Sequence, residues 1–175
     1  MDQLSDKIHK IKCLICDVDG VLTNGLNYID NHGNELKSFN VQDGVGLKLL
    51  MAANIEVAVI TGSFNAVIDH RMEQLGIHHY FKGQINKKQA YDSLKSTLQL
   101  ADEEFAYIGD DVVDLPIMQQ VGFSIAVANA VAHIKSHADW TTVLAGGDGG
   151  LREACDFILA TQNKTTEAIE RYIHS

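Results

Sequence analysis

Short apolar runs that each end in a polar turn are the feature of this sequence that most restricts its fold. Because almost every position in these runs is apolar, they are typical of strands that are buried on both faces. We therefore expect the central strands of a sheet that is covered by helices. The runs are Cys13–Cys16, Val57–Ile60, Phe105–Ile108 and Phe123–Val127.

Segments with a helical repeat of apolar residues lie between these runs. Asp43 and Asn86 are plausible N-caps for two of them. Strands that alternate with helices indicate a mostly parallel sheet with right-handed crossovers. The predicted fold class is therefore α/β, a doubly wound, Rossmann-like parallel sheet in one domain over residues 1–175. The expected helices are 43–53, 65–75, 87–100 and 151–160, the last within a tail that starts at about residue 146.

Residues 26–40 interrupt this alternation, because they read as two short strands on either side of a turn at Asp30–Asn34. We expect a β-hairpin here, inserted after the first strand at about residues 25–40. A lone hairpin is marginally stable in water, and this one carries much apolar surface. It should therefore pack on a partner. The apolar residues are Tyr28, Ile29, Leu36 and Phe39.

The net charge of −9 argues against nucleic acid and anionic membranes as partners. A small anionic substrate is compatible with it, since local cations and a metal can outweigh a screened field. The first ten residues lack the apolar core of a signal peptide, and no apolar run reaches the length of a membrane span. We expect a cytoplasmic protein.

Cys13 and Cys16 form a C-x-x-C pattern that suggests a redox or zinc site. They lie inside a predicted strand, where residues three apart face opposite sides of the sheet. A second C-x-x-C that would complete a zinc site is absent from the sequence. We therefore expect buried structural thiols.

Polar residues gather where the predicted strands end, which is where parallel sheets bind ligands. Asp17 and Asp19 follow the first run, Thr61-Gly62 follow the second, and Asp110, Asp111 and Asp114 follow the third. Lys87 lies near the start of a helix. Each signal alone is more often structural, as a turn, a helix cap or a solvated lysine. Four carboxylates at one edge repel one another unless a cation is present, and carboxylate oxygens without a His/Cys cluster suit Mg²⁺.

This order of motifs resembles the haloacid dehalogenase superfamily of phosphotransferases, whose signatures stand here as DVDGVLT, TG, Lys87 and GDDVVD. The resemblance implies that Asp17 is the nucleophile and that Asp19 is the general acid and base. It implies Mg²⁺ bound by Asp17, Asp110 and the main-chain carbonyl of Asp19. Thr61 and Lys87 would bind the phosphoryl oxygens. Asp111 and Asp114 would orient the metal ligands or bind metal waters.

Four longer segments, FNVQDGVGLKLL, IEVAVITG, LGIHHYFKGQINK and GGDGGLREACDFIL, resemble the 3-deoxy-D-manno-octulosonate 8-phosphate phosphatases. That resemblance implies a homotetramer without a cap domain, in which the hairpins meet at the centre and neighbouring subunits help to cover each site. It implies hydrolysis of this phosphorylated acidic sugar, on the path to lipopolysaccharide. The substrate-binding residues that it implies are Asp19, Asn40, Val41, Gln42, Asp43, Gly44, Lys48, Gly62, Arg71, Lys87 and Arg152.

Two positions depart from that pattern, since the family often has arginine where this chain has Ser63 and Gln42. Both changes remove positive charge near an anionic sugar, so they bear on which sugar is bound. A nonulosonate 9-phosphate of the sialic-acid type is the alternative substrate. A phospho-accepting receiver carries its acid pair and phosphorylated aspartate in the opposite order, and a non-catalytic oligomerisation module would have lost a catalytic group.

Overall fold

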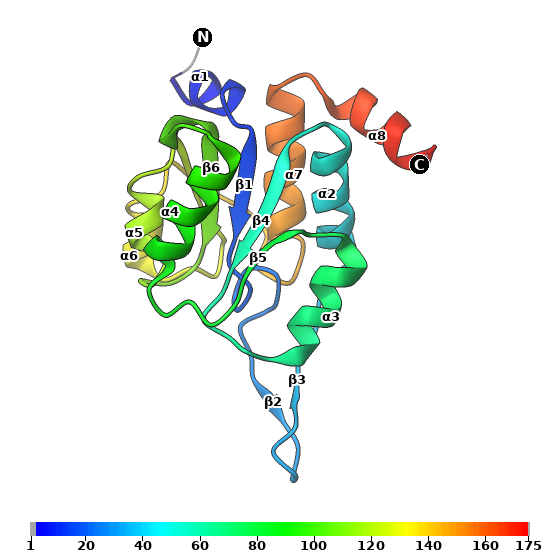
Figure 1. Cartoon of the computed structure of the whole chain (residues 1–175), viewed down its shortest axis with the longest axis vertical. Coiled ribbons are helices and arrows are strands. Elements are labelled where there is room, and N and C mark those ends of the chain that lie inside the picture. Colours follow the sequence, from blue (N-terminus) through cyan, green and yellow to red (C-terminus); the bar gives the residue numbers. More distant parts are fainter. Residues whose placement is uncertain (1–2, 175) are drawn as a thin grey trace.

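A six-stranded parallel sheet forms the centre of the protein, with the strand order β5-β4-β1-β6-β7-β8 (Figure 1). This computed structural model describes residues 3–174. All four predicted strands are present, which confirms the α/β fold. The sequence patterns do not predict β5 and β8, because these edge strands are short and only half-buried. The strands are β1 Cys13–Cys16, β4 Glu56–Ile60, β5 His79–Phe81, β6 Phe105–Gly109, β7 Phe123–Ala126 and β8 Trp140–Thr141.

Helices cover both faces of the sheet. Figure 1 shows α4, α5 and α6 on one side and α2, α3 and α7 on the other, while α8 packs against α2. The predicted helices are confirmed to within a few residues at their ends. Among residues 3–174, none of the helices is long and apolar enough to cross a bilayer. The helices are α1 Gln3–His9, α2 Val41–Ala52, α3 Ala66–Leu75, α4 Lys87–Leu98, α5 Leu115–Met118, α6 Ala132–Lys135, α7 Gly150–Thr161 and α8 Thr165–Ile173, with a 3₁₀ turn at Asp102–Glu104.

The helix after the hairpin starts earlier than predicted, and Asp43 is not its N-cap. Asn40 has an extended backbone, and its side-chain oxygen accepts a hydrogen bond from the Gln42 amide at 2.8 Å. Asparagine is a favoured N-cap because its short side chain reaches an amide of the first turn. Asp43 lies inside the helix with a buried side chain, so its carboxylate has another role.

The three cysteines are unpaired and buried, which confirms the structural interpretation of the C-x-x-C pattern. Cys13 and Cys16 belong to β1, whose residues are all buried between the two helical layers. Burial raises the thiol pKa of both residues and of Cys155. A raised pKa keeps a thiol protonated and therefore unreactive near neutral pH.

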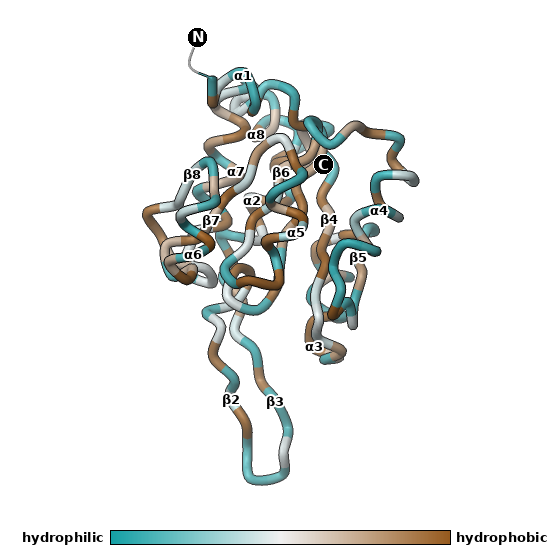
Figure 2. The backbone as a smooth tube through the Cα atoms, turned by 90° about the vertical axis from the view of Figure 1, so that its left-hand side faces the viewer, coloured by the Kyte–Doolittle hydropathy of each residue, from teal (hydrophilic) through white to brown (hydrophobic). Residues whose placement is uncertain are grey.

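The hairpin projects from the sheet as a separate two-stranded ribbon of β2 Tyr28–Ile29 and β3 Glu35–Leu36 (Figure 2). The Asp30 side chain closes its turn by accepting hydrogen bonds from the His32 and Asn34 amides, both at 2.8 Å. Ile29 is 69% exposed and Leu36 62% exposed. In a single chain the hairpin therefore presents apolar side chains to water, and the described residues form no cap domain besides it.

Candidate active site

The polar residues that follow β1, β4 and β6 line one cavity of about 590 Å³ at the carboxyl edge of the sheet. The catalytic candidates expected at this edge come together in the structure. Their backbones continue the strands: the Asp17 amide donates to the Ile108 carbonyl, and the Thr61 amide donates to the Phe81 carbonyl. The predicted residues that line the cavity are Asp17, Asp19, Thr61, Gly62, Lys87, Asp110 and Asp111.

Asp17 is held at the floor of the cavity by two donors on one oxygen. Its Oδ1 accepts from the Val18 amide at 2.6 Å and lies 2.8 Å from the Lys87 ammonium. Lys87 occupies the first position of α4, after the Asn86 N-cap, and its side chain is 3% exposed. Because both donors bind Oδ1, the second oxygen, Oδ2, is left for chemistry.

Asp114 fixes Lys87 from the other side and is fully buried. Its Oδ1 accepts from Lys87 at 2.7 Å and from the Tyr107 hydroxyl at 2.6 Å. Its Oδ2 accepts from the Asp110 and Asp111 amides at 2.9 and 3.3 Å. A carboxylate with this many donors is anchored. Asp114 therefore orients Lys87, and Tyr107 supports it. The sequence gives no sign of Tyr107, which is one of several apolar or aromatic residues in a buried strand.

Three carboxylates at this point form a candidate metal site. Oxygen atoms of Asp17, Asp110 and Asp114 all lie within 4.8 Å of one another. Burial, helped by Asp114, raises the pKa of Asp17 and of Asp110 to about 7. A divalent cation would offset the repulsion between these carboxylates and favour their ionised forms. An all-oxygen donor set fits Mg²⁺. Donors already engage both oxygens of Asp114, so Asp17 and Asp110 are the candidate ligands with a free oxygen.

Glycine is required in the loop after β1 and in the segment that packs against it, because neighbouring atoms lie very close to both. Gly20 has a φ of +91°, and a Cβ at this residue would lie 2.0 Å from Asp110 Oδ2. A Cβ at Gly146 would lie 1.8 Å from the Gly20 carbonyl oxygen. Asn129 bridges the two, since its Nδ2 donates to Gly20 at 3.2 Å and its Oδ1 accepts from Gly146 at 2.7 Å. The glycine-rich tract thus holds the loop that carries Asp17 and Asp19, the two candidate catalytic aspartates.

Comparisons with known proteins agree with this geometry. A family model described as haloacid dehalogenase-like hydrolase matches residues 64–153. A 3-deoxy-D-manno-octulosonate 8-phosphate phosphatase of Salmonella typhi is 48% identical over 162 residues, which are 93% of this chain and 86% of that protein. The chain belongs to this phosphatase family of the haloacid dehalogenase-like hydrolases.

Solved structures extend this relationship to the whole fold. A hydrolase of the haloacid dehalogenase superfamily (subfamily III A) from Legionella pneumophila is 64% identical, with a TM-score of 0.98 over 99% of this chain and 95% of that one. The Moraxella catarrhalis octulosonate 8-phosphate phosphatase is 38% identical, with a TM-score of 0.93 over 98% of this chain and 97% of that one. That structure is a complex with a magnesium ion, a phosphate ion and 3-deoxy-D-manno-octulosonate.

Several residues that the family resemblance assigns to the substrate lie outside the cavity of a single chain. Asp43 is fully buried, and its Oδ1 accepts from the Arg152 amide at 2.8 Å, so it caps the start of α7. Arg71 lies over the Phe39 ring, 5.6 Å from its centroid, and donates to the Asn40 carbonyl at 3.4 Å. The residues of this outer set are Asn40, Val41, Gln42, Asp43, Gly44, Lys48, Arg71 and Arg152, and their contact with substrate stays a prediction.

Glu35 and Lys37, which the hairpin contributes, are among the cavity residues that the sequence does not predict. Lys37 follows β3 and its side chain is 2% exposed. A lysine in a hairpin usually points to solvent, so residue type alone gives no reason to place it in an active site. The signal that could have found it is its proximity to Glu35, which is two residues away and therefore lies on the same side of the strand.

Magnesium affinity of this phosphatase is expected to rise steeply with pH. With the pKa of Asp17 and Asp110 at about 7, both carboxyls are largely protonated at pH 6 and largely ionised at pH 8. Protons compete with the metal, so we expect the dissociation constant of Mg²⁺ to fall at least about tenfold between pH 6 and pH 8. Isothermal titration calorimetry of the metal-free protein at both pH values measures this constant.

The stability of the metal-free protein should change in the opposite sense. Between the ordinary aspartate pKa of 3.8 and about 7, the folded state binds more protons than the unfolded state, so the free energy of unfolding falls as pH rises. Thermal unfolding in the presence of a chelator follows this trend. An Asp110→Asn variant serves as the matched control and should show weaker dependence of both quantities on pH. A wild-type affinity that does not change between pH 6 and 8 would contradict the assignment.

Proposed function

We propose that this protein is a Mg²⁺-dependent phosphomonoesterase that converts 3-deoxy-D-manno-octulosonate 8-phosphate into the free sugar acid and phosphate, in lipopolysaccharide biosynthesis. The observation that carries the proposal is the buried pairing of Asp17 with Lys87, beside Asp110, in a chain that is 48% identical to such a phosphatase. The charges suit the substrate, because an anionic phosphate needs a cation next to its nucleophile.

In the first step, Asp17 Oδ2 attacks phosphorus, and the bond from phosphorus to the sugar oxygen breaks. Asp19 gives its proton to the departing oxygen, so the sugar leaves as a neutral alcohol. The product on the enzyme is an aspartyl-phosphate, which divides one difficult displacement into two easier ones. Lys87 and Thr61 bind the phosphoryl oxygens. The Thr61 hydroxyl oxygen accepts from the Ser63 amide at 3.1 Å, which leaves its hydrogen to donate to phosphate.

In the second step, Asp19 takes a proton from a water molecule, whose oxygen attacks phosphorus. The bond to Asp17 breaks, phosphate is released, and the nucleophile carboxylate is restored. Bound Mg²⁺ supplies charge neutralisation between the carboxylate and the phosphate. We propose Asp17, Asp110 and the Asp19 main-chain carbonyl as its protein ligands. Asp111 lies at the edge of the cavity, where it can bind a water of the metal.

The exact sugar is tested by phosphate release in the presence of Mg²⁺. We expect the highest kcat/KM with octulosonate 8-phosphate, a lower value with a nonulosonate 9-phosphate, and the lowest with an aryl phosphate. A preference for the nine-carbon sugar would replace the substrate in this proposal. Failure to release phosphate from any of the three would refute the enzyme function itself.

We also propose that the hairpins of four chains meet in a homotetramer, where neighbouring chains bring outer residues such as Lys48, Arg71 and Arg152 to a site. The support is the row of exposed apolar side chains on a ribbon that is too small to be stable by itself. The three unpaired, buried cysteines are compatible with the reducing cytoplasm, where we place the protein.

An Ile29→Lys substitution should disrupt this assembly. Ile29 is 69% exposed in the single chain, so the charge is harmless there but becomes costly when the hairpins are buried together. We expect light scattering after size exclusion to change from the mass of a tetramer to that of a monomer or dimer. Thr97→Lys adds the same charge to an exposed position of α4 and should leave the mass unchanged. A wild-type protein that is already monomeric would refute the tetramer.

A further inference from the structure

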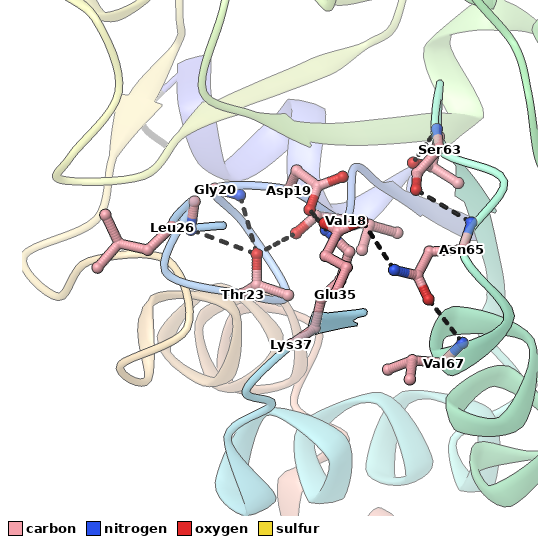
Figure 3. A network of polar contacts seen from close by, with 12 residues as sticks. Val18, Asp19, Gly20, Thr23, Leu26, Glu35, Lys37, Ser63, Asn65 and Val67 are labelled. Atoms are coloured by element: carbon pink, nitrogen blue, oxygen red, sulfur yellow. Dashed lines mark hydrogen bonds and ion pairs between the residues drawn. The ribbon is translucent and has the colours of Figure 1, made fainter. Parts of the chain in front are cut away.

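Lys37 forms an ion pair with the proposed acid and base of the reaction, across a boundary between the hairpin and the sheet. Its ammonium lies 2.5 Å from Asp19 Oδ1 and 2.8 Å from Glu35 Oε1 (Figure 3). The Lys37 side chain is 2% exposed, whereas that of Asp19 is 42% exposed. The buried Lys37 ammonium thus fixes one oxygen of the Asp19 carboxylate, which is otherwise exposed to the open cavity.

Glu35 is itself fixed from the far side of the cavity. The Asn65 Nδ2 donates to Glu35 Oε2 at 2.9 Å, and the Asn65 Oδ1 accepts from the Val67 amide at 2.9 Å as the N-cap of α3. Figure 3 shows Asn65 beside Ser63, whose hydroxyl accepts from the Asn65 amide at 3.2 Å. The contacts therefore form a continuous path from Asp19 through Lys37, Glu35 and Asn65 to the start of a helix.

The Lys37 ammonium stays charged in this setting. Burial by itself lowers the pKa of Lys37, but hydrogen bonds and attraction from Asp19 and Glu35 outweigh burial and raise it. The two carboxylates compensate the cost of removing the Lys37 charge from water, because both lie within hydrogen-bond distance of its ammonium. Glu35 holds the Lys37 ammonium at 2.8 Å independently of its contact with Asp19, so the position of Lys37 does not depend on Asp19 alone.

We propose that Lys37, held by Glu35, is a positioning residue that fixes Asp19 Oδ1, so that Oδ2 carries the proton to the departing sugar oxygen. The inference rests on the proposed function, in which Asp19 is the acid and base. Lys87 already serves the phosphate and the nucleophile from the opposite side. General acid catalysis requires the donor within hydrogen-bond reach of the leaving oxygen, so the cost of losing Lys37 depends on the leaving group.

The test is a Lys37→Met variant, assayed with substrates that differ in their need for a proton. An alkyl phosphate such as octulosonate 8-phosphate has a poor leaving group, whereas 4-nitrophenyl phosphate leaves without protonation. General acid catalysis contributes about 10²–10⁴-fold. We expect the variant to lose at least tenfold in kcat/KM on the sugar phosphate and less than about threefold on the aryl phosphate. Across a series of phenyl phosphates, its rates should depend more steeply on leaving-group pKa.

A second comparison separates positioning from a merely structural role. If Lys37 acts through Asp19, the two substitutions are not additive, and Lys37→Met should cost little further in an Asp19→Asn background. Lys10→Met is the matched control. Lys10 directly follows α1 and is an exposed lysine that pairs with Glu103 at 3.4 Å. It should leave kcat/KM unchanged for both substrates. Lys37→Arg keeps the charge and should restore part of the lost selectivity.

The outcomes distinguish this inference from the function on which it rests. Equal losses on sugar and aryl phosphates would overturn positioning, because they would mean that Lys37 binds phosphate or maintains the fold. Additive losses in the double variant would overturn it as well. Failure of the wild-type protein to hydrolyse either substrate would instead refute the proposed phosphatase.

Discussion

Asp17→Asn is expected to abolish phosphatase activity and to leave the fold intact. The amide oxygen is a poor nucleophile, so the aspartyl-phosphate cannot form, and we expect kcat to fall by about 10⁴-fold or more. The substitution also removes one of three neighbouring buried carboxylates. Burial and repulsion by Asp114 raise the pKa of Asp17 to about 7, so a neutral amide relieves both costs. The metal-free variant should therefore unfold at a temperature equal to or above that of the wild type.

Phosphate release and thermal unfolding measure the two effects together. Asp92→Asn is the matched control, because Asp92 is 56% exposed and pairs with Lys88 on the surface of α4. It should retain full activity. Turnover by Asp17→Asn above about one per cent of wild type would remove Asp17 from the nucleophile role, provided that mass spectrometry shows no deamidation back to aspartate.

Lys87→Met is expected to damage both activity and stability. Lys87 is nearly buried between Asp17 and Asp114, so its loss leaves two carboxylates without their cation. Breaking a buried ion pair by removing one partner costs about 3–5 kcal/mol. Methionine keeps much of the side-chain volume, so this cost is electrostatic. The loss of a cation at the phosphate should lower kcat/KM by at least about 10²–10³-fold.

The next residue in the chain offers an internal control for this substitution. Lys88 is 47% exposed and forms an ion pair with Asp92 at 3.1 Å, four residues along α4. Exposed pairs of this kind are worth little, so Lys88→Met should change the free energy of unfolding by less than about 0.5 kcal/mol. Urea unfolding at pH 8 measures both variants, since the carboxylates are then ionised. Equal stabilities for the two variants would show that Lys87 is not paired as described.

The parts of the fold that sequence patterns predict are those with a strong local signal. β1 and β6 are continuous apolar runs between turns, and α4 follows a clear asparagine cap. β5 and β8 lack such a signal, because they are short edge strands with half-buried side chains and a strand neighbour on only one side. The N-cap of α2 is wrongly predicted as Asp43 for a different reason. Asn40 and Asp43 are both favoured N-cap residues, and the sequence alone does not show which of them starts the helix.

The position of the candidate catalytic residues was predictable because the ends of parallel strands meet at one edge. This topological rule places Asp17, Thr61 and Asp110 together without any knowledge of side-chain contacts. Lys37 and Asp43 illustrate what the rule does not reach. Lys37 enters the cavity because the chain after β3 returns to the loop that follows β1, and Asp43 caps α7, more than a hundred residues later in the chain. Both depend on long-range packing that no local pattern records.

The close approach of Gly146 to Gly20 also has a consequence for how activity arises during synthesis. Every group that we propose to react with the phosphate precedes Leu115 in the chain, so the ribosome synthesises all of them before the glycine-rich tract. The loop carrying Asp17 and Asp19 gains its support only later, from Asn129, Gly146 and the Gly147 amide, which donates to the Val21 carbonyl at 2.8 Å. We therefore expect a nascent chain to be inactive until the glycine-rich tract has emerged and can support this loop.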